Sequence, residues 1–78
     1  MKRYLLFFGE QYYPSQGVGD LVGDFDTLHE AKERFNEVSE ITIKEDFCEN
    51  ISELMQTKYS LIYDSEIKLD VWNYEDKI

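Results

Sequence analysis

The chain has little cysteine, little proline and no long run of apolar residues. It contains a single cysteine, Cys48, so no disulfide can form within it, and we expect a cytoplasmic protein from a reducing compartment. Its apolar runs are far shorter than the roughly 18–20 residues that span a bilayer. The basic start "MKRYLLFFGE" lacks the long apolar run and the cleavage site of a signal peptide. The sequence therefore predicts a soluble protein with no membrane partner.

Positive charge is also scarce. Eight Lys and Arg residues stand against 17 Asp and Glu residues, which gives a net charge of −9. A free-standing nucleic-acid-binding protein needs basic residues for its phosphate contacts, so we expect no direct binding of DNA or RNA. The excess of acid is compatible with solubility alone, because small domains commonly carry charges of magnitude about 2–8. The magnitude of the charge, −9, lies just above that range and slightly favours the other interpretation, a protein partner with a basic surface.

All four glycines and the only proline lie in the stretch "GEQYYPSQGVGDLVGDFDT", residues 9–27. A dinucleotide-binding loop requires glycine at the position of Val22 and a helix that begins inside the motif. Asp20 and Asp24 would in addition repel a bound phosphate. We therefore expect a wide turn between two strands, and no phosphate or nucleotide cofactor.

The pattern of apolar residues predicts a small α+β domain of two layers that comprises residues 1–78. A mainly antiparallel sheet is expected from strands at about 2–8, 21–25, 58–64 and 67–74, with helices at about 27–39 and 46–57. Thr27 and Glu30 form a capping box at the start of the first helix. Residues 40–50 stay ambiguous, because Ile41 and Ile43 alternate as in a short strand. A shorter second helix capped by Asn50 is an alternative.

Side-chain alternation predicts which faces are buried. Both faces of residues 2–8 are apolar, which is typical of a central strand. In the last strand we expect one face on the core and one open. The residues expected on the core face of this strand are Ile67, Leu69 and Val71, and those expected on its open face are Lys68, Asp70, Trp72 and Tyr74. The second helix is expected to pack through Phe47, Ile51, Leu54 and Met55.

No catalytic pattern stands out, and we expect a protein that is not an enzyme. Cys48 and His29 have no spacing that places them in contact, so an inert cysteine is the simplest interpretation. Asp20, Asp24 and Asp26 are close in sequence, but they match no calcium-binding loop. We therefore expect neither a resident metal nor a cofactor.

The most specific feature is a row of acidic residues on the first helix. Glu30, Glu33, Glu37 and Glu40 fall on one face, almost opposite the apolar positions. Residues 24–53 hold ten acids and three bases, a net charge of −7. One interpretation is a solvated helix face with pairs such as Glu30–Arg34. The other is a negative surface that attracts a basic partner.

Aromatic residues are the second unusual set. Tyr12-Tyr13-Pro14 lies in the long loop, and Trp72 lies on the expected open face of the last strand. Exposed Tyr and Trp are typical anchors of protein interfaces, so Tyr13 and Trp72 are candidate contact residues. The alternative is that these rings cover a thin core.

The start "KRYLLFFGEQYYPSQGVGDLVGDFDTLHEA" resembles short hypothetical proteins of phages and cyanobacteria. They share a "YLLF-x-G" strand, a "YYP" loop and an "F-D-T/S-x-x-E-A" helix start. The resemblance implies a phage-encoded accessory protein and, by analogy, a small acidic inhibitor of host defence of the anti-CRISPR or anti-restriction type, acting in the host cytoplasm. The resemblance assigns no catalytic residues to this chain.

The leading hypothesis is thus an acidic binding protein that occupies a basic, nucleic-acid-binding surface of a host protein. Its contacts would be Glu30, Glu33, Glu37, Glu40, Tyr13 and Trp72. One alternative is a small-ligand or metal-binding module built on the loop at residues 9–26. Another is a small regulatory or structural subunit, with the chain as a monomer or a homodimer.

Overall fold

The computed structural model describes residues 1–11 and 20–74 of the chain. It contains four strands and two helices, β1 (Tyr4–Glu10), β2 (Leu21–Phe25), α1 (Leu28–Glu45), α2 (Ile51–Leu54), β3 (Lys58–Asp64) and β4 (Leu69–Asn73). The strands form one sheet in the order β2-β1-β3-β4, and each pair of neighbours is antiparallel. The α+β prediction is confirmed, and so is the central position of the strand with two apolar faces, β1.

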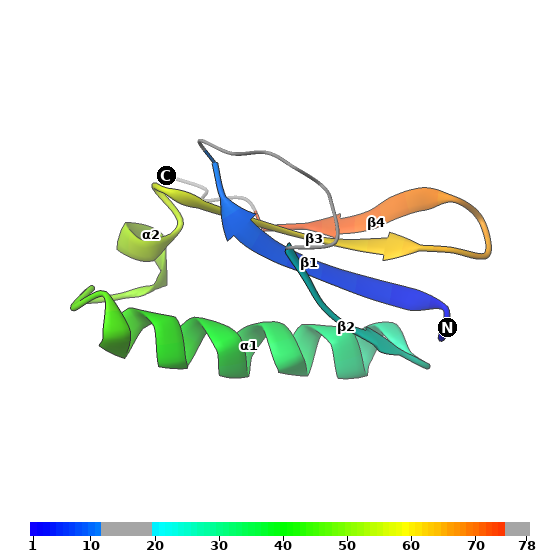
Figure 1. Cartoon of the computed structure of the whole chain (residues 1–78), viewed down its shortest axis with the longest axis horizontal. Coiled ribbons are helices and arrows are strands. Elements are labelled where there is room, and N and C mark those ends of the chain that lie inside the picture. The colour runs from blue at the N-terminus through cyan, green and yellow to red at the C-terminus, as the bar shows by residue number, and fades with distance from the viewer. Residues whose placement is uncertain (12–19, 75–78) are drawn as a thin grey trace.

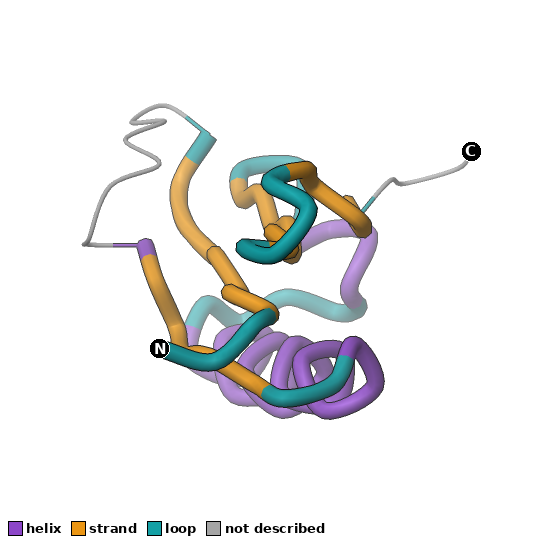
Figure 2. Tube along the Cα trace, turned by 90° about the vertical axis from the view of Figure 1, so that its right-hand side faces the viewer, coloured by secondary structure: helices purple, strands orange, loops and turns teal. Residues whose placement is uncertain are grey.

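The helices form a second layer on one side of the sheet. Helix α1 runs beneath the strands, and the short α2 lies at its carboxyl end, before β3 (Figure 1). Figure 2 shows α1 viewed along its axis, below the sheet. The side of the sheet that faces away from α1 is covered by neither of the described helices. The core between the layers is formed by Leu6, Ala31, Phe35, Leu54, Met55 and Ile62.

Phe35 is the centre of an aromatic cluster. Its ring centroid lies 6.1 Å from that of Phe8, 4.9 Å from that of Trp72 and 5.8 Å from that of Tyr74. These distances fall in the range in which aromatic pairs attract one another beyond their buried area. Aromatic rings thus supply much of the apolar surface that packs in and around this small core.

Helix α1 is longer than the sequence predicts, and the possible strand at residues 40–46 is wrong. The helix continues to Glu45 because its buried stripe continues: Ser39 is buried and Ile43 packs against the core. Ile41 is 53% exposed, so the two isoleucines lie on different sides of a helix rather than on one side of a strand. The Thr42 hydroxyl donates a hydrogen bond of 2.8 Å to the Val38 carbonyl.

The second helix is shorter than residues 46–57. Residues 46–50 form the turn that leaves α1, and α2 has only four residues. The alternative cap is confirmed, because the Asn50 side chain accepts a 2.9 Å hydrogen bond from the Glu53 amide. Leu54 and Met55 are buried as expected, whereas Phe47, which was expected in the packed face, is 91% exposed.

The strands at either end of the sequence also differ from the prediction. Strand β1 begins at Tyr4 and passes through Gly9 to Glu10, and β4 is limited to Leu69–Asn73. Ile67 lies in the preceding turn and is 52% exposed.

The expected open face of β4 is confirmed for Lys68 and Asp70, which are exposed, and wrong for Trp72 and Tyr74, which pack against Phe35. The pairing of β3 with β4 is irregular between Ile62 and Tyr63: Ile62 lies opposite Trp72, but Tyr63 lies opposite Asp70. The extra residue, Val71, is 36% exposed, and Trp72 faces the core beside Phe35. A bulge of this kind reverses the alternation, which a pattern of period two does not reveal.

Candidate functional site

The four predicted glutamates lie together on the outer face of α1. Glu30, Glu33, Glu37 and Glu40 are all exposed, whereas Ala31, Phe35 and Ser39 on the opposite side are buried. At 100° per residue the four occupy an arc of about 80° of the helix circumference. We call this set the acidic face. Figure 2 shows that α1 has the sheet on one side only, which leaves this face open.

The start of the acidic face is fixed by the predicted cap. Thr27 has extended backbone angles, and its hydroxyl oxygen accepts a 3.2 Å hydrogen bond from the Glu30 amide. The Glu30 carboxylate accepts a bond of 3.2 Å from the Thr27 hydroxyl, not from the Thr27 amide as a full capping box requires. A carboxylate in the first turn also interacts favourably with the helix dipole.

Two of the four carboxylates have partners on the same helix. Glu33 lies 2.8 Å from His29, a pair that is ionic only when the imidazole is protonated. Glu37 lies 3.4 Å from Arg34. The expected pair of Glu30 with Arg34 is therefore replaced by a pair three residues apart. Exposed pairs of this type contribute little, about 0.5 kcal/mol or less, so both carboxylates stay accessible to a partner.

Basic residues limit the extent of the acidic face. Lys44 lies one turn beyond Glu40 and in line with it, and Arg34 flanks the row. Helix α1 as a whole holds five acids and three bases, a net charge of −2. The continuous negative surface thus runs from Glu30 to Glu40.

The strand layer, in contrast, pairs its own charges. The side chains of Lys2, Arg3 and Lys58 each pair with at least one acid, whereas Lys68 forms no ion pair within the described residues. The contacts join Lys2 to Asp24 (2.7 Å, from the backbone amide) and Asp26 (3.7 Å), Arg3 to Asp64 (2.8 Å) and Glu66 (3.3 Å), and Lys58 to Glu10 and Asp46 (3.8 Å). The acids that keep accessible charge are therefore mainly on the helical layer.

Of the two predicted aromatic contacts, the structure describes Trp72, and Trp72 does not join the acidic face. Trp72 packs edge-on against Phe35 in the core, so its expected exposure on an open sheet face is wrong. Tyr13, with Tyr12, lies outside the described residues. For Trp72 the alternative that the aromatic rings cover a thin core is therefore confirmed.

The acidic turn residues are engaged within the protein. The Tyr59 hydroxyl donates a 2.6 Å hydrogen bond to Asp20, and burial together with this carboxylate raises the pKa of Tyr59 to about 12. Gly9 permits the approach, because a Cβ atom there would lie 2.5 Å from the Asp20 carboxyl carbon. Within residues 1–11 and 20–74, no three His, Cys, Asp or Glu side chains gather closely enough to hold a metal ion.

The two candidate nucleophile partners are far apart. His29 lies in the first turn of α1 and Cys48 follows its carboxyl end, and an 18-residue helix is about 27 Å long. Burial raises the pKa of the Cys48 thiol, and the nearby carboxylates of Glu53 and Asp46 add to the effect. A raised pKa keeps the thiol protonated and weakly nucleophilic.

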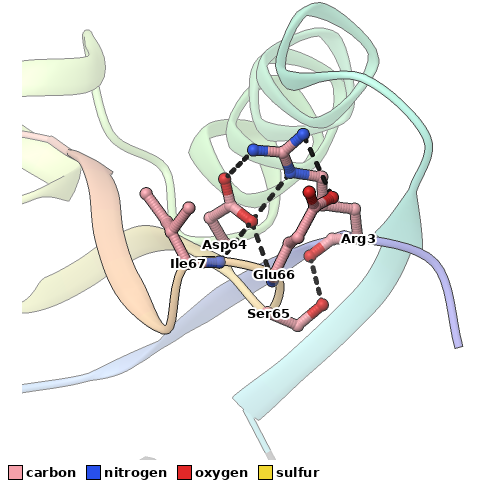
Figure 3. A network of polar contacts seen from close by, with 5 residues as sticks. All are labelled: Arg3, Asp64, Ser65, Glu66 and Ile67. Atoms are coloured by element: carbon pink, nitrogen blue, oxygen red, sulfur yellow. Dashed lines mark hydrogen bonds and ion pairs between the residues drawn. The ribbon is translucent and has the colours of Figure 1, made fainter.

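Asp64 is the one fully buried acid among the described residues, with 2% of its surface exposed. The Arg3 guanidinium donates two hydrogen bonds of 2.8 Å to it, and the Glu66 and Ile67 amides donate two more (Figure 3). The Ser65 hydroxyl and amide donate to the Arg3 carbonyl and close the network. These contacts lower the pKa of Asp64, with the Arg3 hydrogen bond as the largest cause. The carboxylate is thus fully occupied in joining β1 to the hairpin turn.

The outer side of the sheet has a shallow hollow of about 240 Å³. It is lined by Leu5, Phe7, Leu61, Tyr63 and Asp70. Within the described part of the chain Asp70 is the one carboxylate that lines it, so this lining lacks the convergent polar groups that orient a small ligand.

None of the helices within the described residues combines the length and the apolar character that a bilayer span requires. Comparison with curated proteins gives no match, and comparison with solved structures gives none either. A family model described as bacteriophage T4 protein Y07C matches residues 4–74, from the first residue of β1 to the residue after β4. The chain therefore belongs to this phage protein family.

Proposed function

We propose that this phage protein is a non-enzymatic inhibitor that occupies the basic, nucleic-acid-binding surface of a host defence protein. The defence protein would be a CRISPR effector or a restriction enzyme. The observation that carries the proposal is the acidic face, with four exposed glutamates on one side of a helix. In this role the carboxylates stand in for the phosphates of DNA or RNA.

The spacing of the carboxylates suits this role. From Glu30 to Glu40 the helix rises about 15 Å, so four carboxylates follow one another about every 5 Å. Phosphates on one strand of DNA rise by about 3.4 Å each, which is the same order. Glutamate side chains are long and flexible, so their ends can adapt to Lys and Arg residues placed for a phosphate backbone.

The charge distribution supports the same role. The net charge of −9 attracts a basic protein from a distance and accelerates association. Because Lys2, Arg3 and Lys58 are paired with acids, these three basic residues of the strand layer oppose this attraction only weakly. The acidic face would then fix the orientation of the complex.

The test is displacement of DNA from purified host proteins. Fluorescence anisotropy of a labelled duplex would be measured on a CRISPR effector complex and on a panel of restriction endonucleases, with the chain added at increasing concentration. The variant carries Glu33→Lys and Glu37→Lys. The matched control carries Glu66→Lys and Asp70→Lys, which reverses two exposed acids outside α1.

The proposal predicts that the wild-type chain displaces DNA from one member of the panel. Reversal at Glu33 and Glu37 should weaken displacement at least about tenfold, because it turns attraction into repulsion at the contact. The control should stay within about threefold of wild type. Equal potency of the two double variants would show that total charge acts without the acidic face.

A further inference from the structure

Phe47 occupies an unusual position directly after α1. Its amide donates a 3.4 Å hydrogen bond to the Lys44 carbonyl, and the Cys48 amide donates one of 2.9 Å to the Ile43 carbonyl. This pair of bonds defines a Schellman motif, in which the residue at the position of Phe47 adopts left-handed backbone angles. Phe47 has a φ of 56°.

A phenylalanine is unfavourable at this position. Glycine usually occupies it, because the Cβ atom of any other residue crowds the following carbonyl in the left-handed region. The ring gains no packing energy in return, since 91% of the residue surface is exposed. The backbone strain therefore opposes folding, and the exposed ring contributes nothing that offsets it. Strained residues of this kind cluster at functional sites; among the described residues Lys68, with a φ of 60° in the turn before β4, is the other non-glycine residue in this region.

The turn presents the ring on a rigid support. Asp46, the residue before Phe47, lies 3.8 Å from Lys58 of β3. Cys48, the residue after it, packs against the core, and so does Ile43 in the last turn of α1. Because the backbone on both sides is held, little conformational entropy is lost when the ring enters a binding pocket.

We propose that Phe47 is the anchor of the protein interface and enters an apolar pocket of the partner. This inference rests on the proposed function and names a further feature of the same partner. Three exposed carboxylates, those of Glu45, Asp46 and Glu49, and one base, Lys44, lie within three residues of the anchor, so its surroundings are net negative. The complementary surface is therefore an apolar pocket bordered by Lys or Arg residues. A buried aromatic ring at the centre of such a contact is typical of an interface hot spot.

Site-specific photo-crosslinking tests the anchor. The full chain with p-benzoylphenylalanine at position 47 would be expressed in bacterial cells and irradiated, and the cross-linked peptides would be mapped by mass spectrometry. The matched control carries the same group at position 67. Ile67 is also an exposed apolar turn residue, and its hairpin turn lies at the other end of the molecule (Figure 1). Far-UV circular dichroism of both variants verifies that they fold.

The proposal predicts one predominant adduct from position 47 that position 67 does not form. Its cross-linked peptide should contain apolar residues with Lys or Arg within a few positions. The same protein should lose at least about tenfold of its affinity for the variant Phe47→Ala. No adduct, the same adducts from both positions, or full affinity of Phe47→Ala would overturn the anchor.

A second set of variants separates this inference from the proposed function. The crosslinker at position 47 is combined with Glu33→Lys and Glu37→Lys. An adduct that persists at full yield supports the anchor and contradicts phosphate mimicry by the acidic face. An adduct that is lost with the charge reversal supports a single interface that includes both features.

Discussion

Replacement of Phe47 by glycine should stabilise the protein, although it removes the largest side chain of the turn. Glycine adopts the left-handed region without the Cβ conflict that phenylalanine has at a φ of 56°. The ring is 91% exposed, so its removal sacrifices almost no buried area. The expected gain therefore comes from the backbone alone.

The magnitude follows from two opposing terms. The left-handed conformation costs a residue with a Cβ atom about 1–2 kcal/mol. Glycine at the same position loses about 0.5–1 kcal/mol of additional chain entropy on folding. The midpoints of these ranges favour Phe47→Gly by about 0.75 kcal/mol, within a span of about 0–1.5 kcal/mol, and the midpoint corresponds to a rise in Tm of about 4 °C for a domain of this size.

The assay is thermal and urea unfolding of three proteins, followed by far-UV circular dichroism. Phe47→Ala is the matched control, because it removes the ring but keeps the Cβ atom and thus the strain. Its Tm should lie within about 2 °C of the wild-type value. A Phe47→Gly variant no more stable than Phe47→Ala would refute the strain, and with it the argument that the ring is retained for binding.

Three further changes test the fold. The Arg3 guanidinium lowers the pKa of Asp64, so the carboxylate stabilises the native state above about pH 4 and loses this effect as the pH falls through its native pKa. Asp64→Asn should therefore lower the free energy of unfolding at pH 7 and make that free energy decline less steeply in acid. Urea unfolding across pH measures both effects. Gly9→Ala should push the Asp20 carboxylate away and bring the pKa of Tyr59 down from about 12, which ultraviolet titration would detect. Ser39 has a buried hydroxyl with no hydrogen-bond partner among residues 1–11 and 20–74, so Ser39→Ala should raise stability by about 1 kcal/mol. An unchanged urea midpoint would contradict this.

The parts of the fold that depend on local pattern were predictable from the sequence. The two apolar faces of residues 2–8 indicated the central strand, although β1 is shifted toward Glu10. The Thr27 side chain indicated the start of α1, and helical spacing placed the four glutamates on one exposed face. Each of these features is decided within a few residues, so tertiary contacts had little to change.

The remainder depends on contacts between distant residues. The irregular pairing at Ile62 and Tyr63 directs Trp72 toward Phe35. No residue type in β4 predicts such a bulge. Helical spacing alone placed Phe47 on a packed helix face. Its actual backbone conformation is set by the packing of Ile43 and Cys48 against the core, which local spacing does not reveal. An exposed anchor in a left-handed turn has no sequence signature when the residue is neither glycine nor asparagine.

The most direct test of the account asks whether nucleic acid and this protein exclude each other on one target. The target found in the displacement assay would be titrated with labelled DNA at several fixed concentrations of the chain. If carboxylates of the acidic face replace phosphates, the apparent Kd for DNA should rise in proportion to the chain concentration, and no ternary complex should form. A stable complex of target, DNA and this protein would contradict the central claim.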